Sequence, residues 1–288
     1  MLDKHTIRQH FERAADTYDA AAVLQKEIAK RLCERLDYIK LQPKRVLDVG
    51  CGTGYITADL LKRYSKSQVI ALDIALNMAQ KSQQHRTGFF KGKHFGRSKP
   101  LAICADAEQL PLKKESADLI ISSLMLQWSN SLADTFRGFH ATLAPNGLLL
   151  FTTFGPDTLK EVRESWASVD NSPHTSTFAD MHEIGDALLG AGFMNPVTDM
   201  ETITMTYANV RQVMRDIKQI GASNSDNARQ KGLMGKQKLK AFEQAYEQFK
   251  TRDGLYPATW EIVYGHAWVG EGVKTDNFKG IEIQTVTD

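Results

Sequence analysis

The pattern of apolar positions predicts helix from Asp3 to Ile39, because apolar side chains recur there every three or four residues. After Pro43 the pattern changes to short apolar runs, which are separated by stretches of helical periodicity. Strand and helix therefore alternate five times up to Phe154. The predicted strands are RVLDV (45–49), QVIALD (68–73), LAICAD (101–106), ADLIISSLMLQW (117–128) and GLLLFTTF (147–154).

Beyond Phe154 the alternation is less regular. Helical periodicity covers 157–166, 181–193 and a basic segment at 209–249, and two further strands are predicted at 198–207 and 259–269. We therefore expect an α/β fold: a doubly wound, mostly parallel seven-stranded sheet with an N-terminal helix and a helical C-terminal insertion. Ligands of such sheets bind outside the carboxyl ends of the strands.

Length and composition narrow the class of protein. The 288 residues are enough to bury a large core in one domain, or in a domain with a satellite. No apolar run approaches the roughly 20 residues of a membrane helix, and the N-terminus is too polar for a secretory signal. We expect a cytoplasmic protein without membrane contact. Cys33, Cys51 and Cys104 show no CxxC spacing, so neither a metal site nor a disulfide framework is expected.

A glycine-rich turn follows the first predicted strand. Gly50, Gly52 and Gly54 allow a sharp turn and let a ligand approach the N-terminus of the next helix. Tyr55 stands where a dinucleotide fingerprint requires Gly or Ala, and no Gly-Lys-Ser/Thr of a P-loop is present. The turn therefore argues against a cofactor bound through its pyrophosphate.

Acidic residues end the next two strands. Asp73 lies 19 residues beyond Gly54, where its carboxylate can accept hydrogen bonds from both hydroxyls of a ribose. Asp106 ends the following strand and is followed by Ala107 and Glu108. Three acids and a glycine turn suit a cationic nucleoside without phosphates, and S-adenosylmethionine is such a molecule. The alternative is a purely structural turn with solvated carboxylates.

Five motifs in this region are similar to those of class I S-adenosylmethionine-dependent methyltransferases, a family with a Rossmann-like fold. The resemblance covers about residues 40–155 through VLDVGCGTG, ALDIALNM, ADAEQLPL, SSLMLQW and LAPNGLLLFTTF. It implies that the three turn glycines hold the methionyl part, Asp73 the ribose, and Asp106 with Ala107 the adenine edge. The full predicted cofactor set is Tyr18, Gln25, Asp48, Gly50, Gly52, Gly54, Asp73, Ile74, Asp106, Ala107 and Ser123.

The flanking motifs are similar to those of malonyl-acyl-carrier-protein O-methyltransferases, the enzymes that open the biotin pathway. They are FERAADTYDAAAVLQ (11–25), LQWSNSL (126–132), FTTFGPDTLKEV (151–162), SPHTSTF (172–178), VMRDIKQIGAS (213–223) and GLYPATWEI (254–262). The resemblance reaches Val269 and departs at a long connection, 85–100. It implies lid helices at 1–40, a cofactor-binding core at 41–208 and 253–270, a basic insertion on the substrate side at 209–252, and a tail at 271–288.

The implied reaction is methyl transfer to the free carboxylate of a malonyl thioester. A carboxyl group with a pKa of about 4 is ionised at neutral pH, so the reaction needs no general base. Catalysis then consists mainly of positioning, which contributes up to roughly 7–11 kcal/mol. Arg215 first, and Lys218 second, are the predicted groups that orient the carboxylate, since residues three apart share one face of a helix. The alternative is that both are solvent-facing cations.

The basic segment suggests a macromolecular partner. The net charge is only +2, which gives no general attraction to nucleic acid, but 209–252 carries a local +6. Malonyl-acyl-carrier protein, an acidic partner, is therefore expected to dock there through Lys231, Lys236, Lys238 and Lys240, unless these lysines only form a solvated face. We expect a monomer that does not bind nucleic acid.

Other readings remain open. Tyr18 and Gln25 could lie on a plain core helix instead of a lid, and His174 could shape either a pocket or a turn. The nearest rival function is a cofactor-binding assembly factor, or a hydroxylase-like protein, of respiratory complexes, whose members resemble GPDTLKEVR and SNSDNARQ. A small-molecule carboxyl methyltransferase is a further alternative. FFKGKHFGRSK (89–99) would suit a nucleic-acid methyltransferase, although the near-neutral charge argues against it.

Overall fold

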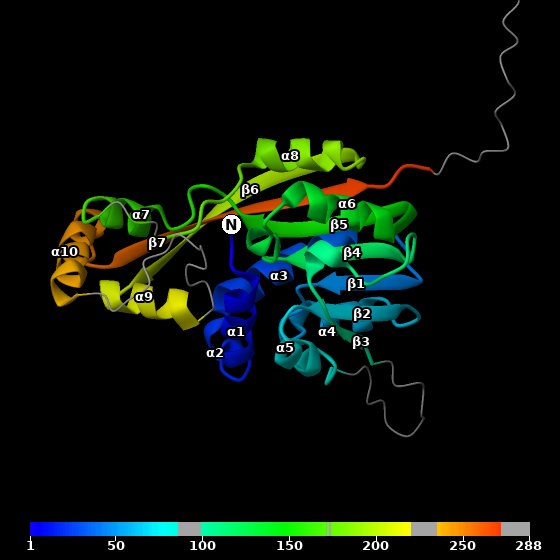
Figure 1. Ribbon diagram of the computed structural model, residues 1–288, viewed down its shortest axis with the longest axis horizontal. Coiled ribbons are helices and arrows are strands. Elements are labelled where there is room, and N and C mark those ends of the chain that lie inside the picture. Colours follow the sequence, from blue (N-terminus) through cyan, green and yellow to red (C-terminus); the bar gives the residue numbers. More distant parts are fainter. Residues whose placement is uncertain (86–98, 171, 173, 220–234, 272–288) are drawn as a thin grey trace, which may run out of the picture.

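The computed structural model describes residues 1–85, 99–170, 172, 174–219 and 235–271 (Figure 1). Seven strands form one sheet in the order β3-β2-β1-β4-β5-β7-β6. Buried apolar runs form these strands, as in RVLDV, whose last four residues are buried. The strands are β1 (Arg45–Val49), β2 (Gln68–Asp73), β3 (Leu101–Cys104), β4 (Ala117–Ser123), β5 (Leu143–Phe154), β6 (Met194–Tyr207) and β7 (Tyr256–Trp268).

The first five strands run parallel, while β7 is antiparallel to both β5 and β6. Strand order therefore reverses between β1 and β4, and a crevice opens outside their carboxyl ends. β6 and β7 are long and extend past the rest of the sheet, where α7, α9 and α10 gather on them (Figure 1). The described structure confirms the predicted doubly wound, mostly parallel sheet.

Helices cover both faces of the sheet. They are α1 (Lys4–Ala14), α2 (Tyr18–Ala21), α3 (Val23–Arg35), α4 (Tyr55–Arg63), α5 (Leu76–Ser82), α6 (Leu132–Thr142), α7 (Lys160–Ala167), α8 (Met181–Gly190), α9 (Val210–Gln219) and α10 (Lys236–Tyr246). Short 3-10 turns follow at η1 (Leu36–Tyr38), η2 (Ala107–Gln109), η3 (Leu126–Trp128) and η4 (Glu247–Phe249). None of these helices has the length and apolar character that crossing a membrane requires, as far as the chain is described.

Alternate residues of the central strands enter two separate cores. Leu148 and Leu150 of β5 pack on one face with α3, α4, α7, α9 and α10, whereas Leu149 and Phe151 pack on the other with α6 and α8. This alternation is the period of two expected of a strand that is buried on both faces. The sheet is therefore a rigid platform for the crevice at its carboxyl edge.

The N-terminal segment differs from the single helix predicted for Asp3 to Ile39. It forms three helices and a 3-10 turn, with breaks after Ala14 and at Ala22. The Thr17 amide and hydroxyl both bond to the Ala14 carbonyl, which closes a turn where the helix would have continued. Ala15 and Ala22 are buried at these breaks, so the chain folds back over the crevice.

Two predicted strands also end earlier than expected. β3 stops at Cys104, because the Asp106 side chain accepts a hydrogen bond from the Glu108 amide and caps η2. β4 stops at Ser123, because Leu124 adopts a left-handed conformation with φ of 51° and leads into η3. Of the connection 85–100 only residues 85, 99 and 100 are described, and of the tail predicted at 271–288 only residue 271. The rest of both segments lies outside the described residues.

Candidate cofactor and acceptor site

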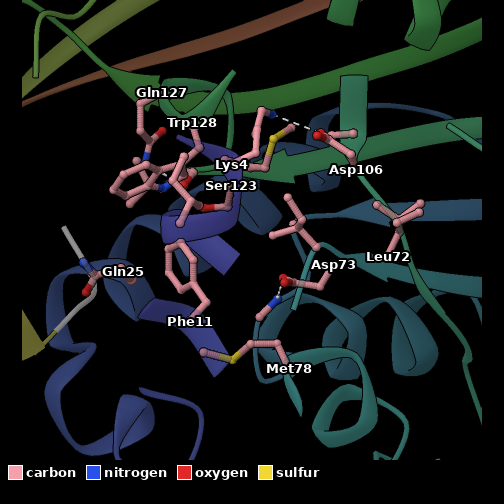
Figure 2. A pocket seen from close by; sticks show the side chains of 18 of the residues that line it. Lys4, Phe11, Gln25, Leu72, Asp73, Met78, Asp106, Ser123, Gln127 and Trp128 are labelled. Carbon is pink, nitrogen blue, oxygen red and sulfur yellow. Dashed lines mark hydrogen bonds and ion pairs between the residues drawn. The ribbon is translucent and has the colours of Figure 1, made fainter. Parts of the chain in front are cut away.

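A cavity of about 90 Å³ lies at the carboxyl ends of β1, β2 and β4, where the strand order reverses (Figure 2). Most of the predicted cofactor residues meet there. Those that line it are Tyr18, Gln25, Gly50, Gly52, Asp73, Ile74, Asp106, Ala107 and Ser123. Ligand pockets usually measure roughly 300–1,000 Å³, so the side chains over this cavity must move outward when a ligand of that size enters.

The glycine turn has the backbone geometry that its sequence predicts. Gly50, Gly52 and Gly54 have φ angles of 73°, 53° and 94°, all in the left-handed region. A Cβ on Gly50 would lie 2.6 Å from the side chain of Met125, so the turn and η3 approach each other as closely as a residue without a side chain allows. Gly54 does not line the cavity. It begins α4 and packs against Ser82 and His85.

Asp73 is the buried carboxylate at the centre of the cavity wall. One of its oxygens accepts from the Gly52 amide at 2.9 Å and the other from the Ala75 amide at 2.8 Å. Burial raises the pKa of Asp73 to about 6, although the two amide hydrogen bonds oppose the shift. Each carboxylate oxygen has a second lone pair, so the carboxylate still has two positions for hydroxyl donors.

Asp48 lies behind the glycine turn rather than in the main cavity. It lines an adjoining cavity of about 60 Å³ together with Tyr18 and Gln25. Its carboxylate accepts a 2.6 Å hydrogen bond from the Thr57 hydroxyl, and burial raises its pKa to about 7. The geometry therefore ties Asp48 to the base of α4, and a direct contact with the cofactor stays a prediction.

These two carboxyl groups predict how the stability of the unliganded protein varies with pH. Both pKa values, about 7 for Asp48 and about 6 for Asp73, lie above the ~3.9 of aspartate in an unfolded chain. Between these values the native protein binds more protons than the unfolded chain, so the free energy of unfolding falls as pH rises. We expect Tm to drop by roughly 5–10 °C from pH 5.5 to 8.

Thermal melts of the wild type and of Asp48→Asn, recorded across this pH range, measure the effect. The asparagine keeps an oxygen that accepts from Thr57, so the variant should fold and should lose much of the pH slope. Equal slopes for the two proteins would contradict the assignment to Asp48.

Asp106 and its neighbours form the other wall of the cavity. Asp106 caps η2 by accepting from the Glu108 amide at 3.1 Å, and Ala107 is buried beside it. The Lys4 ammonium lies 3.0 Å from Asp106 (Figure 2). It also lies 2.9 Å from Glu108. Lys4, from the first turn of α1, is therefore a member of this site that the sequence analysis did not identify.

The N-terminal segment covers the cavity from above. Phe11 packs edge-on against Trp128 at 5.6 Å and lies beside Tyr18 at 6.4 Å. Burial, followed by the charge of Asp73, raises the pKa of the Tyr18 hydroxyl, so it is a neutral hydrogen-bond donor. The Glu12 carboxylate accepts from the amides of Leu76 and Asn77, at 2.7 and 2.9 Å, and so caps α5.

Gln25 provides a test of whether the cavity suits a cationic cofactor. Its Oε1 is buried and has no hydrogen-bond donor among the described residues. A buried acceptor left without a partner is costly, and a ligand ammonium would satisfy it. With Asp73 for ribose hydroxyls and a turn open to close approach, these residues fit S-adenosylmethionine. Groups of three or more metal-ligating side chains do not occur in the described ranges.

A second cavity, of about 400 Å³, adjoins the first and shares Gln127, Trp128 and Phe154 with it. Its wall comes mainly from α7, α9, α10, β7 and the segment before α8, and it is largely aromatic and aliphatic. Lys218 and His174 are its ionisable residues, and none of the described residues that line it is Asp or Glu. The cavity therefore suits an acceptor with negative charge or exposed oxygens.

The two predicted carboxylate-binding residues are placed differently. Lys218 lines the second cavity, next to Met214 and Ile217 of α9. Both residues are exposed, but Arg215 lines neither cavity. Residues three apart on a helix are offset by about 60° around its axis, which separates a cavity position from a solvent position. The role of Arg215 stays a prediction.

Comparisons with known proteins give a consistent picture. A family model described as "Methyltransferase domain" matches residues 22–195. The chain is 50% identical over 268 residues to a malonyl-[acyl-carrier protein] O-methyltransferase of Gallionella capsiferriformans, covering 93% of this chain and 91% of that protein. It is 38% identical over 282 residues to the protein of that name from Legionella pneumophila, covering 98% and 96%.

Solved structures show the same fold at low sequence identity. The YcgJ protein of Bacillus subtilis superposes with a TM-score of 0.56 at 14% identity, covering 84% of this chain and 98% of that chain. A phosphoethanolamine N-methyltransferase 2 of Haemonchus contortus, solved with phosphomonomethylethanolamine and S-adenosylhomocysteine, gives 0.54 at 18% identity, covering 92% and 60%. These likenesses identify a fold that class I methyltransferases share.

Proposed function

From the premise that this chain belongs to the family of malonyl-[acyl-carrier protein] O-methyltransferases, we propose that it methylates the free carboxylate of a malonyl thioester. The methyl donor is S-adenosylmethionine. The product is the methyl ester with which pimeloyl and biotin synthesis starts in this family. The single observation that carries the proposal is 50% identity across 93% of the chain, and two adjoining cavities at the carboxyl edge of the sheet agree with it.

The reaction requires no proton transfer. The bound cofactor supplies a methyl group on a positively charged sulfur. A carboxylate oxygen of the acceptor forms the new bond to the methyl carbon, and the electron pair of the broken bond remains on sulfur. Since the acceptor is already ionised at neutral pH, the chain's own task is to hold both reactants in line and to exclude water.

The first cavity is the proposed cofactor site. Asp73 would bind the ribose hydroxyls, Asp106 and Ala107 the adenine, and Gln25 the methionyl ammonium. Support comes from the burial of Asp73 and from the unsatisfied acceptor of Gln25. Gly50 and Gly52, which line this cavity, would lie against the methionyl part, and the backbone is open at Gly52, where a Cβ would meet nothing within 4 Å.

Residues 1–40 are proposed to act as a lid over this cavity. Several contacts tie the segment to the sheet edge: Lys4 pairs with Asp106 and Glu108, Glu12 caps α5, Asp16 pairs with Lys81 at 3.0 Å, and Asp19 accepts from the Thr53 hydroxyl at 2.8 Å. We further propose residues 41–208 and 253–270 as the catalytic core and 209–252 as an insertion on the acceptor side.

The second cavity is the proposed acceptor site, because it adjoins the first and shares Gln127, Trp128 and Phe154 with it. The methyl group would cross at these shared residues. Lys218 would supply the positive charge that holds the malonyl group, since it is the lysine of this wall.

This placement predicts unequal effects of two neighbouring substitutions. Lys218→Met should raise KM for the malonyl thioester about 10- to 100-fold, the equivalent of one hydrogen bond to a charged group. Arg215→Met should change it less than threefold, because Arg215 lines neither cavity. Steady-state kinetics with malonyl-carrier protein compare the two. A larger effect of Arg215→Met would show that the insertion binds the acceptor in another arrangement.

The carrier protein is the proposed partner. Lys236 and Lys240 are exposed near the start of α10 and are candidates for docking. Lys238 instead pairs with Asp170 at 2.8 Å, and Lys231 lies outside the described residues. We also propose that the protein acts as a cytoplasmic monomer that binds neither nucleic acid nor membranes. The molar mass of the purified protein in solution, measured by light scattering, tests whether it is a monomer.

Incubation of the purified protein with malonyl-carrier protein and methyl-labelled cofactor tests the function. We expect label in a methyl ester that mild alkali releases. Cofactor binding without ester formation would instead support the assembly-factor alternative. Transfer to free dicarboxylic acids but not to the thioester would support a small-molecule carboxyl methyltransferase.

A further inference from the structure

His174 lies in the wall of the second cavity with its ring held in one plane. The imidazole stacks on Trp166 with ring centres 3.9 Å apart and an angle of 12° between the planes. Trp166 in turn stacks on Phe242 at 4.3 Å and 13°. These three rings connect the segment before α8 to α7 and α10, so the imidazole cannot tilt without disturbing a buried stack.

Asp170 fixes the rotation of the same ring. Its Oδ1 lies 2.7 Å from His174 Nε2 and accepts from the Ser172 amide at 3.0 Å, and its Oδ2 lies 2.8 Å from Lys238 Nζ. The hydrogen bonds from Lys238 and then His174 hold the pKa of Asp170 well below its usual range, so this carboxylate only accepts. Nε2 therefore carries a proton and donates it to Asp170, which leaves Nδ1 for a ligand.

A second residue of the same cavity also lacks a partner. Trp260 of β7 lines the cavity and is 2% exposed, and its Nε1 has no acceptor among the described residues. A buried donor without an acceptor indicates that a ligand supplies one. With no carboxylate among the described lining residues, the cavity offers hydrogen-bond donors and positive charge to its occupant.

We propose that His174, whose Nε2 is held by Asp170, donates a hydrogen bond from Nδ1 to an oxygen of the acceptor's malonyl group. The inference rests on the proposed function and adds an acceptor-binding residue to it. Asp170 is the positioning residue that keeps Nε2 occupied. Lys218 of α9 contributes charge to the same cavity. His174 thus selects acceptors that present an acyl oxygen at this depth of the cavity.

Two amide substitutions distinguish the ring nitrogens. The amide nitrogen of asparagine takes approximately the place of histidine Nδ1, and that of glutamine approximately the place of Nε2. We expect His174→Asn to keep the affinity for a malonyl thioester within about threefold of wild type, and His174→Gln to weaken it about 10- to 100-fold. A structural role through Asp170 predicts the opposite order.

Affinity for malonyl-pantetheine is measured by calorimetry with S-adenosylhomocysteine present, so the readout does not depend on turnover. Both variants lose the ring that stacks on Trp166, so Tm should fall by a similar amount in each, while cofactor affinity should remain near wild type. His182→Asn, which changes an exposed histidine on α8, is the matched control. Weaker binding by His174→Asn than by His174→Gln, equal effects of the two, or no binding by the wild type would overturn the inference.

Ester formation by the wild type tests the proposed function separately, since binding can succeed where turnover fails.

Discussion

Asp73→Asn should weaken the affinity for S-adenosylmethionine about 100-fold or more. A carboxylate that accepts two hydroxyl hydrogen bonds loses its charge on both, and hydrogen bonds to charged groups contribute about 1.5–3 kcal/mol each. The substitution also turns an amide donor toward the backbone amide of Gly52 or Ala75, both of which now donate to Asp73. Isothermal titration calorimetry of the unliganded protein measures the effect directly.

Asp118→Asn is the matched control for this variant. Asp118 of β4 also accepts two backbone hydrogen bonds, from Lys44 at 2.7 Å and Arg45 at 2.8 Å. It lies beside the start of β1, at the end of the strand that is opposite to the cofactor cavity. We expect cofactor affinity there to stay within about twofold, while stability falls by roughly 1 kcal/mol. If both variants bound the cofactor like the wild type, the first cavity would not be its site.

Gly50→Ala should destabilise the fold strongly. The residue has a φ of 73°, and its new Cβ would lie 2.6 Å from both Cβ and Cγ of Met125. Left-handed backbone costs about 1–2 kcal/mol in alanine, and overpacking adds about 1–3 kcal/mol. A loss of about 3 kcal/mol lowers Tm by roughly 6–12 °C in a chain of this size.

Gly52→Ala separates the two contributions. Gly52 has a φ of 53°, but a Cβ there would meet nothing within 4 Å. We therefore expect a loss of only about 1 kcal/mol, from backbone strain alone. Differential scanning calorimetry of the two variants tests the difference. Equal losses would mean that η3 moves away from the turn at little cost and that close packing does not shape the cavity.

Local sequence was sufficient for the strands that carry the site. β1 and β2 begin and end at the predicted residues, because each is a continuous buried run bounded by a polar start and by a glycine turn or Asp73. The break at Ala15 was not predictable in the same way. The apolar spacing continues through it, and the turn is stabilised by burial of small residues against distant elements.

The acceptor side depended on contacts between distant segments, which a pattern along the chain does not show. Lys218 and Arg215 are both basic residues of one predicted helix, so the sequence does not distinguish them. Only the packing of α9 on β6 and β7 decides which of the two lines the cavity. The role of Lys4 was not predictable for the same reason, since its partners Asp106 and Glu108 lie about a hundred residues away in the sequence. His174 was recognised only as part of a motif, because its role requires the ring of Trp166 and the charge of Asp170.

The salt bridges of Lys4 bear on the rate at which the enzyme completes a cycle. If residues 1–40 act as the proposed lid, spent and fresh methyl donor must pass this segment, which contacts of Lys4, Glu12, Asp19 and others hold on the sheet edge. Each exchange would then require these contacts to break. We expect a burst of ester formation followed by a slower steady-state rate, with release of the demethylated donor as the rate-limiting step.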